Sequence, residues 1–567
     1  MRWWLAIALA AGCGDNLDGT CRSWLQWGGN AAHDDGSCVR GQPLTSVLAD
    51  VAIDPFVAQE VAEGDGDLFL HYQAPLVTGD LMFTMAKAGT FTPCVREPDG
   101  SVRCAPLRLD SQVWIEQAYR VVADTGTLQP RWSYATDWKP VPFQRFEPMF
   151  QGALTGDRIV LPAGNGGVWE LDQETGAVRA HYEPFAHAPV MRDGVRVAGG
   201  IAVGPDGTLY YSAMQIGEPT GARYGSWLVA IAPDGTETIV DYATLVPDAP
   251  AADAPCFAHY FAEPKPWPPQ QPDGSVQLPQ QYACGAQRPQ LNLAPAIGPD
   301  GTVFVATHAA GNGAYGYVVA LDHALGVKWA TSLRDHLHDG CGGLVAPSAE
   351  LCPPGTPAGV DPFTGLPPAG EVDDNSSGSP VALPDGGVLY GAYTGYNGSR
   401  GHLFRFDAGG AVMATYDFGW DTTPSVIGSG ADMRIITKDN HYGRDANGVD
   451  LGPYYITALD GALDVVWQAP STNTQSCARG DDGAVTCVAD HPNGFEWCVN
   501  AVAVDRDGTI FANSEDGYAY AFTADGRQRD ALFLDQALGA AYTPVALDPR
   551  GRTFTLNSGH LLELGVR

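Results

Sequence analysis

A hairpin that recurs along the chain limits the possible folds more than any other feature of the sequence. Its clearest copy, residues 167–182, alternates apolar residues such as Val168 and Leu171 with polar ones, and a polar turn closes it at Gly176. Such alternation on both sides of a glycine-bearing turn predicts two antiparallel strands. Recurrence of the hairpin every few tens of residues predicts one repeat architecture, so a chain of 567 residues need not contain several domains.

Two kinds of hairpin alternate along the sequence. The first kind often carries Asp-Gly in its turn, as at Asp300-Gly301, because the turn requires a positive φ that glycine adopts without steric cost. It occurs eight times, starting near residues 75, 148, 199, 295, 380, 424, 500 and 544. A hairpin of the second kind follows each of the first seven copies, whereas only one strand, residues 560–564, follows the last.

Eight units of four strands predict an all-β fold, an eight-bladed β-propeller made of four-stranded antiparallel blades. The last blade lacks one strand, and the apolar segment at residues 44–53 is the best candidate to supply it. Pairing of that N-terminal segment with the C-terminal strand would close the ring and remove two exposed sheet edges. Long apolar stripes of helical period are rare, so we expect little helix.

The repeats resemble those of the PQQ-type, or quinoprotein-like, β-propellers. The repeat pattern of that family, Gly-x-Val-x-Ala-Leu-Asp-x-x-Thr-Gly-x-x-x-Trp, is nearly met at residues 166–179 and 316–329. The sequence Trp27-Gly-Gly-Asn30 looks like the opening of BamB-like outer-membrane assembly lipoproteins. The resemblance covers residues 26–566 and implies the propeller architecture, although Ala414 stands where the pattern has Trp. It implies little about chemistry, because one fold carries many functions.

The N-terminus predicts an exported protein that is held by a lipid. A positive residue, a short apolar run and small residues precede Cys13, which is the pattern of an export signal. The sequence Ala10-Ala-Gly-Cys13 resembles the bacterial lipoprotein signal, which implies removal of residues 1–12 and diacylation of Cys13. An ordinary cleaved signal is the alternative. Later segments fall short of the roughly 20 apolar residues that a spanning helix needs. We therefore expect a protein anchored to the bacterial cell envelope, on the outer membrane, that does not cross the bilayer.

Residues 13–40 are expected to form a tether with an N-terminal disulfide, and residues 41–567 a single propeller. Four inserts rich in cysteine or proline interrupt its repeats, at about residues 92–106, 243–291, 335–376 and 470–498. They connect neighbouring blades or the two hairpins of one blade, and because strands alternate in direction, both connections leave the sheet on the same face. Loops on a rigid scaffold often carry function, so we expect this face to bind a partner. The alternative is that the inserts only cover the funnel mouth.

Twelve cysteines in an exported chain predict disulfide bonds. With Cys13 set aside, neighbouring cysteines suggest five pairs: Cys21 with Cys38, Cys94 with Cys104, Cys256 with Cys284, Cys341 with Cys352, and Cys477 with Cys487. Cys498 is then left over, and it could pair with Cys477 or Cys487 instead. The sequence does not choose among these pairings.

The charge of the chain excludes one class of partner. It has 65 acidic and 32 basic residues, a formal net charge of -33, which repels the phosphate backbone of nucleic acids and anionic lipid surfaces. We expect no nucleic-acid partner, and contact with a membrane only through the N-terminal lipid anchor. A soluble, solvated surface is the simplest reason for such acidity.

A His-x-His sequence within residues 335–339 is the best metal-binding candidate. On an extended segment this spacing puts the imidazoles of His336 and His338 on one side, with the Asp339 carboxylate next to them. Solvated loop histidines beside a disulfide are the alternative interpretation. Two runs of oxygen ligands could hold calcium, although neither has EF-hand spacing and turn capping is the alternative. They are Asp373, Asp374 and Asn375, and Asp505, Asp507 and Asn513.

The sequence argues against the cofactor that the family resemblance invites. PQQ-dependent dehydrogenases commonly carry adjacent cysteines over the quinone, and this chain has no Cys-Cys pair. It also has no Cys-x-x-Cys-His haem motif and no Gly-x-Ser-x-Gly nucleophile motif. We therefore predict no cofactor and no catalytic residue, with PQQ or calcium as open possibilities. The sequence favours a non-enzymatic scaffold that binds an envelope protein, peptide or glycan; an exported enzyme, such as a divergent PQQ-dependent dehydrogenase, is the alternative.

Overall fold

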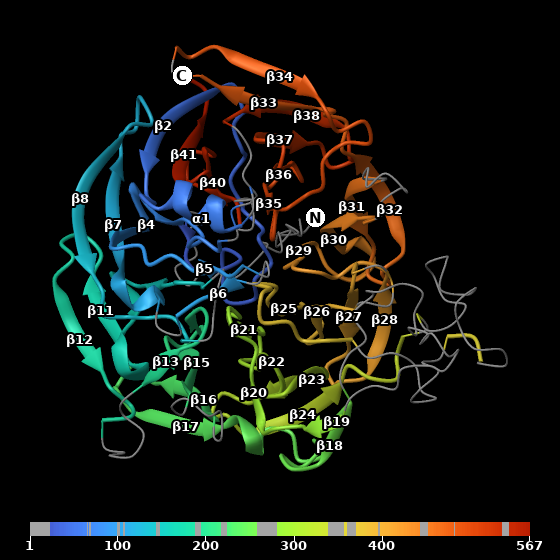
Figure 1. Cartoon of the computed structure of the whole chain (residues 1–567). Coiled ribbons are helices and arrows are strands. Elements are labelled where there is room, and N and C mark those ends of the chain that lie inside the picture. The colour runs from blue at the N-terminus through green and yellow to red at the C-terminus, as the bar shows by residue number, and fades with distance from the viewer. Residues whose placement is uncertain are drawn as a thin grey trace, which may run out of the picture.

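A computed structural model of the chain shows eight antiparallel sheets of four or five strands arranged around one axis (Figure 1). It describes residues 23–64, 66, 68, 70–98, 102–105, 108–142, 148–186, 194–216, 224–257, 281–337, 339, 357–359, 370–394, 397, 399–442, 452–480, 482–535 and 544–567. Each sheet is one blade, so the predicted eight-bladed β-propeller is confirmed. Within these residues the structure has one α-helix, α1 (Val57–Glu63).

The first four blades follow the chain in order, and in each the strands run from the axis to the rim (Figure 1). Blade 1 contains β3 (Leu76–Thr78), β4 (Leu81–Gly89), β7 (Gln112–Val121) and β8 (Leu128–Ala135); blade 2 contains β9 (Ala153–Thr155), β10 (Arg158–Pro162), β11 (Val168–Asp172) and β12 (Val178–Tyr182). Blade 3 contains β13 (Val195–Val197), β14 (Ala202–Val203), β15 (Leu209–Ile216), β16 (Tyr224–Ile231) and β17 (Glu237–Asp241). Blade 4 contains β20 (Gln287–Pro289), β21 (Ala296–Ile297), β22 (Val303–Ala309), β23 (Asn312–Leu321) and β24 (Val327–Ser332).

The other four blades are plain four-stranded sheets. Blade 5 contains β25 (Val381–Ala382), β26 (Val388–Ala392), β27 (His402–Phe406) and β28 (Val412–Tyr416); blade 6 contains β29 (Ser425–Ile427), β30 (Arg434–Asn440), β31 (Tyr454–Leu459) and β32 (Val465–Pro470). Blade 7 contains β35 (Ala503–Val504), β36 (Ile510–Asn513), β37 (Tyr518–Phe522) and β38 (Gln528–Phe533). Blade 8 contains β39 (Ala546–Leu547), β40 (Thr553–Asn557), β41 (His560–Gly565) and, at its rim, β2 (Ser46–Ala52).

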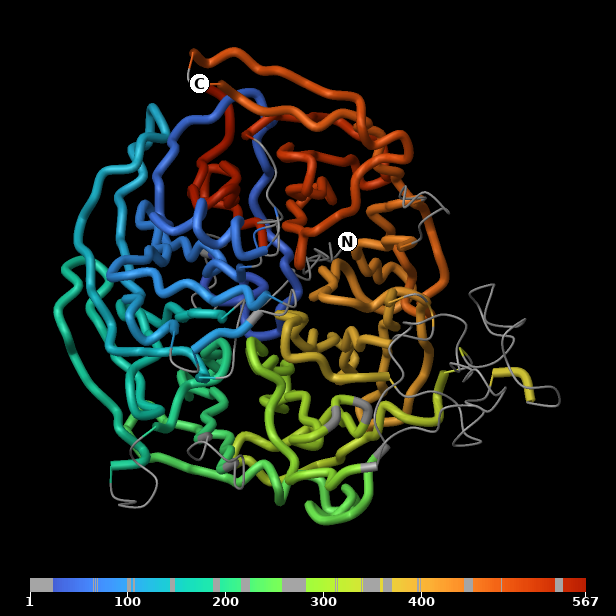
Figure 2. Tube along the Cα trace, viewed as in Figure 1, coloured from blue at the N-terminus to red at the C-terminus, as the bar shows by residue number. Residues whose placement is uncertain are grey.

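Blade 8 joins the two ends of the chain, as predicted. Strand β2 runs antiparallel to β41, with Ser46 opposite Gly565 and Ala52 opposite His560. Figure 2 shows this junction as the place where the blue start of the trace lies beside its red end. The pairing gives β41 a partner on its outer side and so removes an exposed edge from the ring.

Contacts between neighbouring blades explain why the repeat carries Trp and Gly. Trp132 on β8 donates from Nε1 to the Gln173 carbonyl in the β11–β12 turn at 2.8 Å. Its ring lies over Gly176, where a Cβ would come within 2.6 Å of the ring, so a larger residue would force the blades apart. Trp329 and Trp467 make the same two kinds of contact with the blades that follow them. The repeat tryptophans are therefore packing residues between blades.

The segment at residues 23–42 closes the axis of the ring. It is hydrogen-bonded to the inner part of all eight blades. Strand β1 (Ser23–Trp24) pairs with β3 of blade 1, the Leu25 carbonyl accepts from Leu154 of blade 2, and the Gln26 side chain accepts from Val203 of blade 3. The backbone carbonyls of the next residues accept from blades 4 to 7 in turn: Ala31 from Ile297, Ala32 from Ala382, Asp34 from Val426 and Asp35 from Val504. The Gln42 backbone amide donates to the Gly551 carbonyl of blade 8. We expected residues 13–40 to form a tether, but from residue 23 onward this range is part of the propeller.

Trp27 lies at the centre of this segment. Its side chain is fully buried and packs against Ala74, Met149 and Ala294, which directly precede inner strands of blades 1, 2 and 4. Its Nε1 donates to the Thr423 hydroxyl of blade 6 at 3.3 Å. One aromatic side chain thus contacts four blades at the axis.

Candidate functional site

The connections between strands place the inserts on one face of the disc. In an antiparallel blade, the link from the second strand to the third and the link to the next blade both leave at the end where the inner strand begins. In the described parts of the inserts, three extra hairpins belong to such links: β5 (Val95–Arg96) with β6 (Val102–Arg103), β18 (Pro255–Phe257) with β19 (Gln281–Ala283), and β33 (Gln475–Arg479) with β34 (Val485–Ala489). We call this side the insert face.

The opposite side, which we call the turn face, carries the tight turns that follow the inner strands. The N-terminal segment enters the ring from this side, because Ser23 pairs with Thr78 and Trp24 with Val77 at the end of β3. Gly79 then begins the turn to β4 with a φ of 60°. The two faces therefore differ, since one carries short turns and admits the N-terminal segment to the axis, and the inserts leave from the other.

Three of the expected disulfides are present, and all three hold inserts: Cys94 with Cys104, Cys256 with Cys284, and Cys477 with Cys487. Cys38 is also disulfide-bonded. Four cysteines lie outside the described residues, namely Cys13, Cys21, Cys341 and Cys352. The sequence left open whether Cys498 pairs with Cys477 or Cys487. Because Cys477 pairs with Cys487 in the structure, Cys498 is a free thiol.

The Cys498 thiol is enclosed beside blade 7. Burial raises its pKa well above the usual value, and the carboxylates of Glu515 and Glu496 raise it further. Ligand atoms of these three side chains lie within 4.8 Å of one another. Burial and a raised pKa both keep a thiol protonated, which lowers its reactivity.

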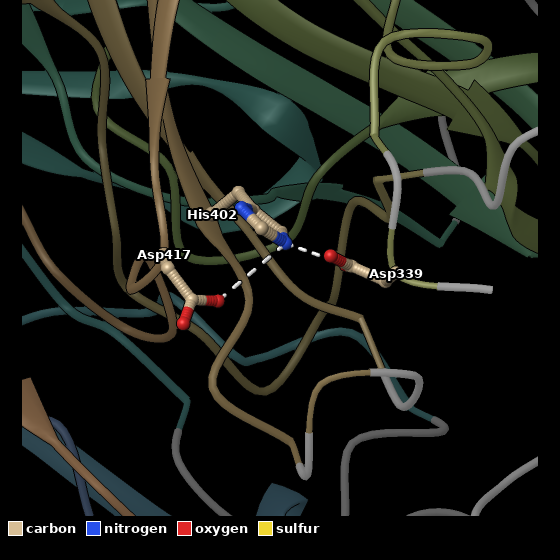
Figure 3. A group of neighbouring side chains, drawn as sticks. All are labelled: Asp339, His402 and Asp417. Atoms are coloured by element: carbon tan, nitrogen blue, oxygen red, sulfur yellow. Dashed lines mark hydrogen bonds and ion pairs between the residues drawn. The ribbon is translucent and has the colours of Figure 1, made fainter. Parts of the chain in front are cut away.

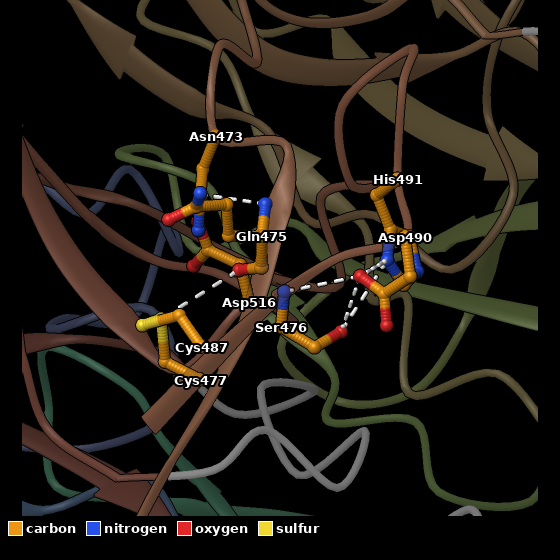
Figure 4. Close-up of a disulfide and its surroundings, with 8 residues drawn as sticks. All are labelled: Asn473, Gln475, Ser476, Cys477, Cys487, Asp490, His491 and Asp516. Atoms are coloured by element: carbon orange, nitrogen blue, oxygen red, sulfur yellow. Dashed lines mark hydrogen bonds and ion pairs between the residues drawn. A yellow bond between two sulfur atoms is a disulfide. The ribbon is translucent and has the colours of Figure 1, made fainter. Parts of the chain in front are cut away.

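The hairpin β33–β34 leaves the ring at the insert face and lies along the outer rim beside β38 (Figure 1), and Figure 4 shows its disulfide and the polar residues around it. The Cys477 disulfide joins directly opposed residues of its two strands. Asn473 donates to Asp516 of blade 7 at 3.0 Å and fixes the start of the hairpin. Val485 and Val488 on β34 are 43% and 65% exposed, and among the described residues β34 pairs with β33 alone. A free strand edge with apolar side chains is the kind of surface to which an extended polypeptide adds.

Three titratable side chains meet on the insert face beside blade 5 (Figure 3). Asp339 comes from the insert after blade 4, His402 begins β27, and Asp417 directly follows β28. His402 Nε2 is 2.5 Å from Oδ2 of Asp339 and 3.9 Å from Oδ1 of Asp417. Asp339 and His402 are buried, and Asp417 is partly buried. An imidazole with two carboxylates is a ligand set that zinc and related metal ions accept.

Neighbouring polar groups hold this cluster in place. The Asn397 side-chain amide donates to Asp417 Oδ1 at 2.8 Å and lies 3.2 Å from His402 Nε2. Arg400 binds Asp417 Oδ2 at 2.8 Å and Asp439 Oδ1 at 3.2 Å. Burial raises the pKa of Asp417, and the Arg400 guanidinium opposes this effect.

The sequence grouped Asp339 with His336 and His338, whereas the structure groups it with His402 and Asp417. The His336 ring instead meets the Phe404 ring edge-on, with centroids 6.3 Å apart. His338 lies outside the described residues. Sequence reasoning missed His402 because it is 63 residues from Asp339. The repeat pattern could have indicated the cluster, because it places the start of β27, the end of β28 and the insert on the same face of the propeller.

One carboxylate of each calcium candidate, Asp505 and Asp374, uses its oxygens in other contacts. Asp505 Oδ1 accepts from the Thr509 backbone N–H at 2.7 Å and so caps a turn. Asp374 accepts from Arg288 at 2.5 Å and from His308 Nε2 at 3.2 Å. Burial alone would raise the pKa of Asp374, but Arg288 and His308 outweigh it and lower that pKa below its usual range. These contacts favour the turn-capping and ion-pairing interpretation.

Buried polar side chains near the axis test whether PQQ would fit there. His71 of blade 1 interacts with Asp421 and Lys438 of blade 6, and burial lowers its pKa to about 4. Asp421 accepts from the Ser377 backbone N–H and from Asn500 Nδ2, each at 2.9 Å. PQQ carries three carboxylates and would require several cationic partners. The group formed by His71, Asp421 and Lys438 contains a single cation, so these side chains do not match the three carboxylates of PQQ.

Fold and site together define a class, an eight-bladed β-propeller with disulfide-held inserts on one face. The chain is similar to quinohemoprotein alcohol dehydrogenase from Comamonas testosteroni, with a TM-score of 0.50 and 11% identity over 98% of this chain and 83% of that one. It is also similar to BamB from Moraxella catarrhalis (TM-score 0.36, 14% identity, 84% and 100% coverage) and to Sqt1 from Saccharomyces cerevisiae (TM-score 0.42, 12% identity, 93% and 99% coverage).

These identities are low enough that the similarities show the fold alone, and at this level the resemblance to PQQ-type propellers is confirmed. No protein-family model matches the chain, and no curated protein matches it. In the part of the chain that the structure describes, no helix has the length and apolar character needed to cross a bilayer.

Proposed function

We propose that this protein is a non-enzymatic binding scaffold of the cell envelope whose insert face engages a protein partner. The observation that carries the proposal is the difference between the two faces. Short turns line the turn face, where the N-terminal segment enters, whereas the links that carry the three disulfide-linked hairpins all leave from the insert face. Rigid loops on a stable scaffold are a common basis for recognition.

The β33–β34 hairpin supplies a mode of binding. An extended segment of the partner adds to the free edge of β34, so that backbone hydrogen bonds supply affinity. Val485 and Val488 offer it apolar side chains that are already exposed. The disulfide between the two strands orders this surface before binding, which lowers the entropy lost when the partner arrives.

The proposed location is the envelope, with the insert face directed away from the membrane. Disulfides are typical of oxidising compartments outside the cytosol. In this proposal the Cys13 lipid anchor precedes Ser23 by ten residues, a distance of at most about 35 Å when fully extended. Because the chain enters the ring from the turn face, such an anchor holds that face toward the bilayer.

Affinity capture from envelope extracts tests the proposal. The wild-type protein should enrich a protein partner, and the double change Val485→Asp, Val488→Asp should abolish the enrichment. Met413→Asp is the matched control, because Met413 is 61% exposed on the rim strand β28. Equal capture by all three proteins would contradict the proposed surface, and capture that survives protease treatment of the extract would point to a glycan. Reduction of a dye by the protein with PQQ, calcium and an alcohol would overturn the non-enzymatic assignment.

A further inference from the structure

We propose that Asp339, His402 and Asp417 bind one divalent transition-metal ion, with zinc as the best match. The ion would link Asp339, in the insert after blade 4, to two strand ends of blade 5. This inference does not depend on the identity of any binding partner. It rests on the hydrogen bonds, the burial and the charge of the cluster.

Hydrogen bonds fix the side chains around His402 Nε2. The Asn397 amide nitrogen donates its two protons to the Gly401 carbonyl and to Asp417 Oδ1, each at 2.8 Å, and its Oδ1 accepts two backbone N–H groups at 3.1 Å each. With Asn397 held in this way, Asp339 Oδ2 lies 2.5 Å from His402 Nε2. A metal ion would take the place of the proton between these two atoms, since the nitrogen lone pair and the carboxylate would then both face the cation.

The second oxygen of Asp339 supports the same conclusion. The residue is only 2% exposed, and its Oδ1 has no hydrogen-bond partner among the described residues. Figure 3 shows the Asp339 carboxylate directed at the His402 ring. A buried carboxylate oxygen without a partner is costly, and coordination to a metal ion is a common way to satisfy it.

The charge of the cluster matches a divalent cation. The cluster and its neighbours hold three carboxylates and one guanidinium, because Arg400 pairs with Asp417 and Asp439 while Asp339 contacts His402. With the histidines neutral, these groups carry a net charge of about -2 at neutral pH. The imidazole of His402 selects the kind of ion, because calcium and magnesium prefer oxygen ligands alone.

The distances fit a tetrahedral ion after small movements. Zinc bonds of about 2.0–2.2 Å place tetrahedral ligand atoms roughly 3.3 Å apart. In the structure the nitrogen of His402 lies 2.5 Å and 3.9 Å from the two carboxylate oxygens, on either side of that value. Three protein ligands leave a fourth position for water.

Zinc titration of the dialysed, tag-free full-length protein against a chromophoric chelator tests the proposal. The wild type should bind one zinc per chain, and cobalt should give visible absorption bands. Asp339→Asn and His402→Gln should each lower zinc affinity at least about 100-fold, beyond the roughly 10–100-fold effect of changes outside the ligand set. His336→Ala is the matched control and should bind zinc like the wild type.

Circular dichroism and melting of the metal-free variants establish that they are folded, and Asp417→Asn replaces any variant that is not. Absence of zinc binding by the wild type would overturn the proposal. Unchanged affinity in Asp339→Asn and His402→Gln would also overturn it. Loss in His336→Ala with retention in His402→Gln would assign the metal to the histidines of residues 336–338 and reject the cluster.

Discussion

Glu116 offers a sharp test of how this propeller tolerates charge in its interior. The side chain is fully buried, Oε1 accepts from Gln73 Nε2 at 3.3 Å, and Oε2 has no hydrogen-bond partner among the described residues. Burial raises the pKa of this carboxyl from 4.5 to about 8, although Gln73 opposes the shift. Between these two pH values the folded protein therefore holds a proton that the unfolded chain releases.

The sign of the pH dependence follows from that shift. Because the folded pKa lies above the unfolded one, the contribution to stability is fully present below pH 4.5 and is lost as the pH rises through about 8. One pKa unit corresponds to about 1.4 kcal/mol, so the loss approaches about 5 kcal/mol at its upper limit. Glu116→Gln keeps a neutral group of the same shape. It should change the free energy of unfolding by less than about 1 kcal/mol at pH 5 and raise it by about 3–5 kcal/mol at pH 9.

Urea unfolding at pH 5, 7 and 9 measures this difference. Glu237→Gln is the control, because Glu237 is an exposed carboxylate on the rim strand β17. Other buried acids, such as Glu563, affect the wild type and both variants alike, so the comparison isolates Glu116. Parallel pH profiles for the wild type and Glu116→Gln would refute the claim that this carboxyl is held neutral by burial.

Two further predictions concern other buried groups. Trp27→Ala should lower the free energy of unfolding by about 3–5 kcal/mol, because it leaves a cavity where one ring contacts four blades. A loss below about 1 kcal/mol in denaturant unfolding would show that the Trp27 side chain does not help to hold the blades together. Cys498 should resist maleimide in the folded protein and react after unfolding without reductant, because its thiol is buried and free. Mass spectrometry of the labelled peptide checks this, and rapid labelling of native protein would contradict the assigned environment.

The repeat made most of the fold predictable. Asp-Gly turns such as Asp300-Gly301, period-two strands and a missing last strand carry local information, and local information is what a sequence displays. The pairing of residues 44–53 with the C-terminal strand followed from counting strands. The choice between Cys487 and Cys498 as partner of Cys477 did not follow, because it depends on the register of one hairpin.

Two features could not be read from the sequence, for different physical reasons. The segment at residues 23–42 looks like a polar, glycine-rich linker, because most of its bonds to the blades use backbone groups, which leave no pattern in side-chain polarity. The cluster around His402 is assembled from three separate segments. The sequence identified Asp339 as a candidate metal ligand, but it did not identify His402 and Asp417, since only the blade geometry brings the three residues together.

The attachment of residues 23–42 to every blade has a consequence for the order of folding. This segment leaves the ribosome or an export channel before any blade, yet its partners extend from Val77 to Gly551. Contacts of such long sequence separation form late and slowly. Trp27 therefore stays without its pocket until nearly the whole chain has emerged, and a chain that stops before blade 8 lacks the partners of Gln42 and β2. Residues 23–42 therefore make all of their hydrogen bonds to the blades only when the last blade has folded.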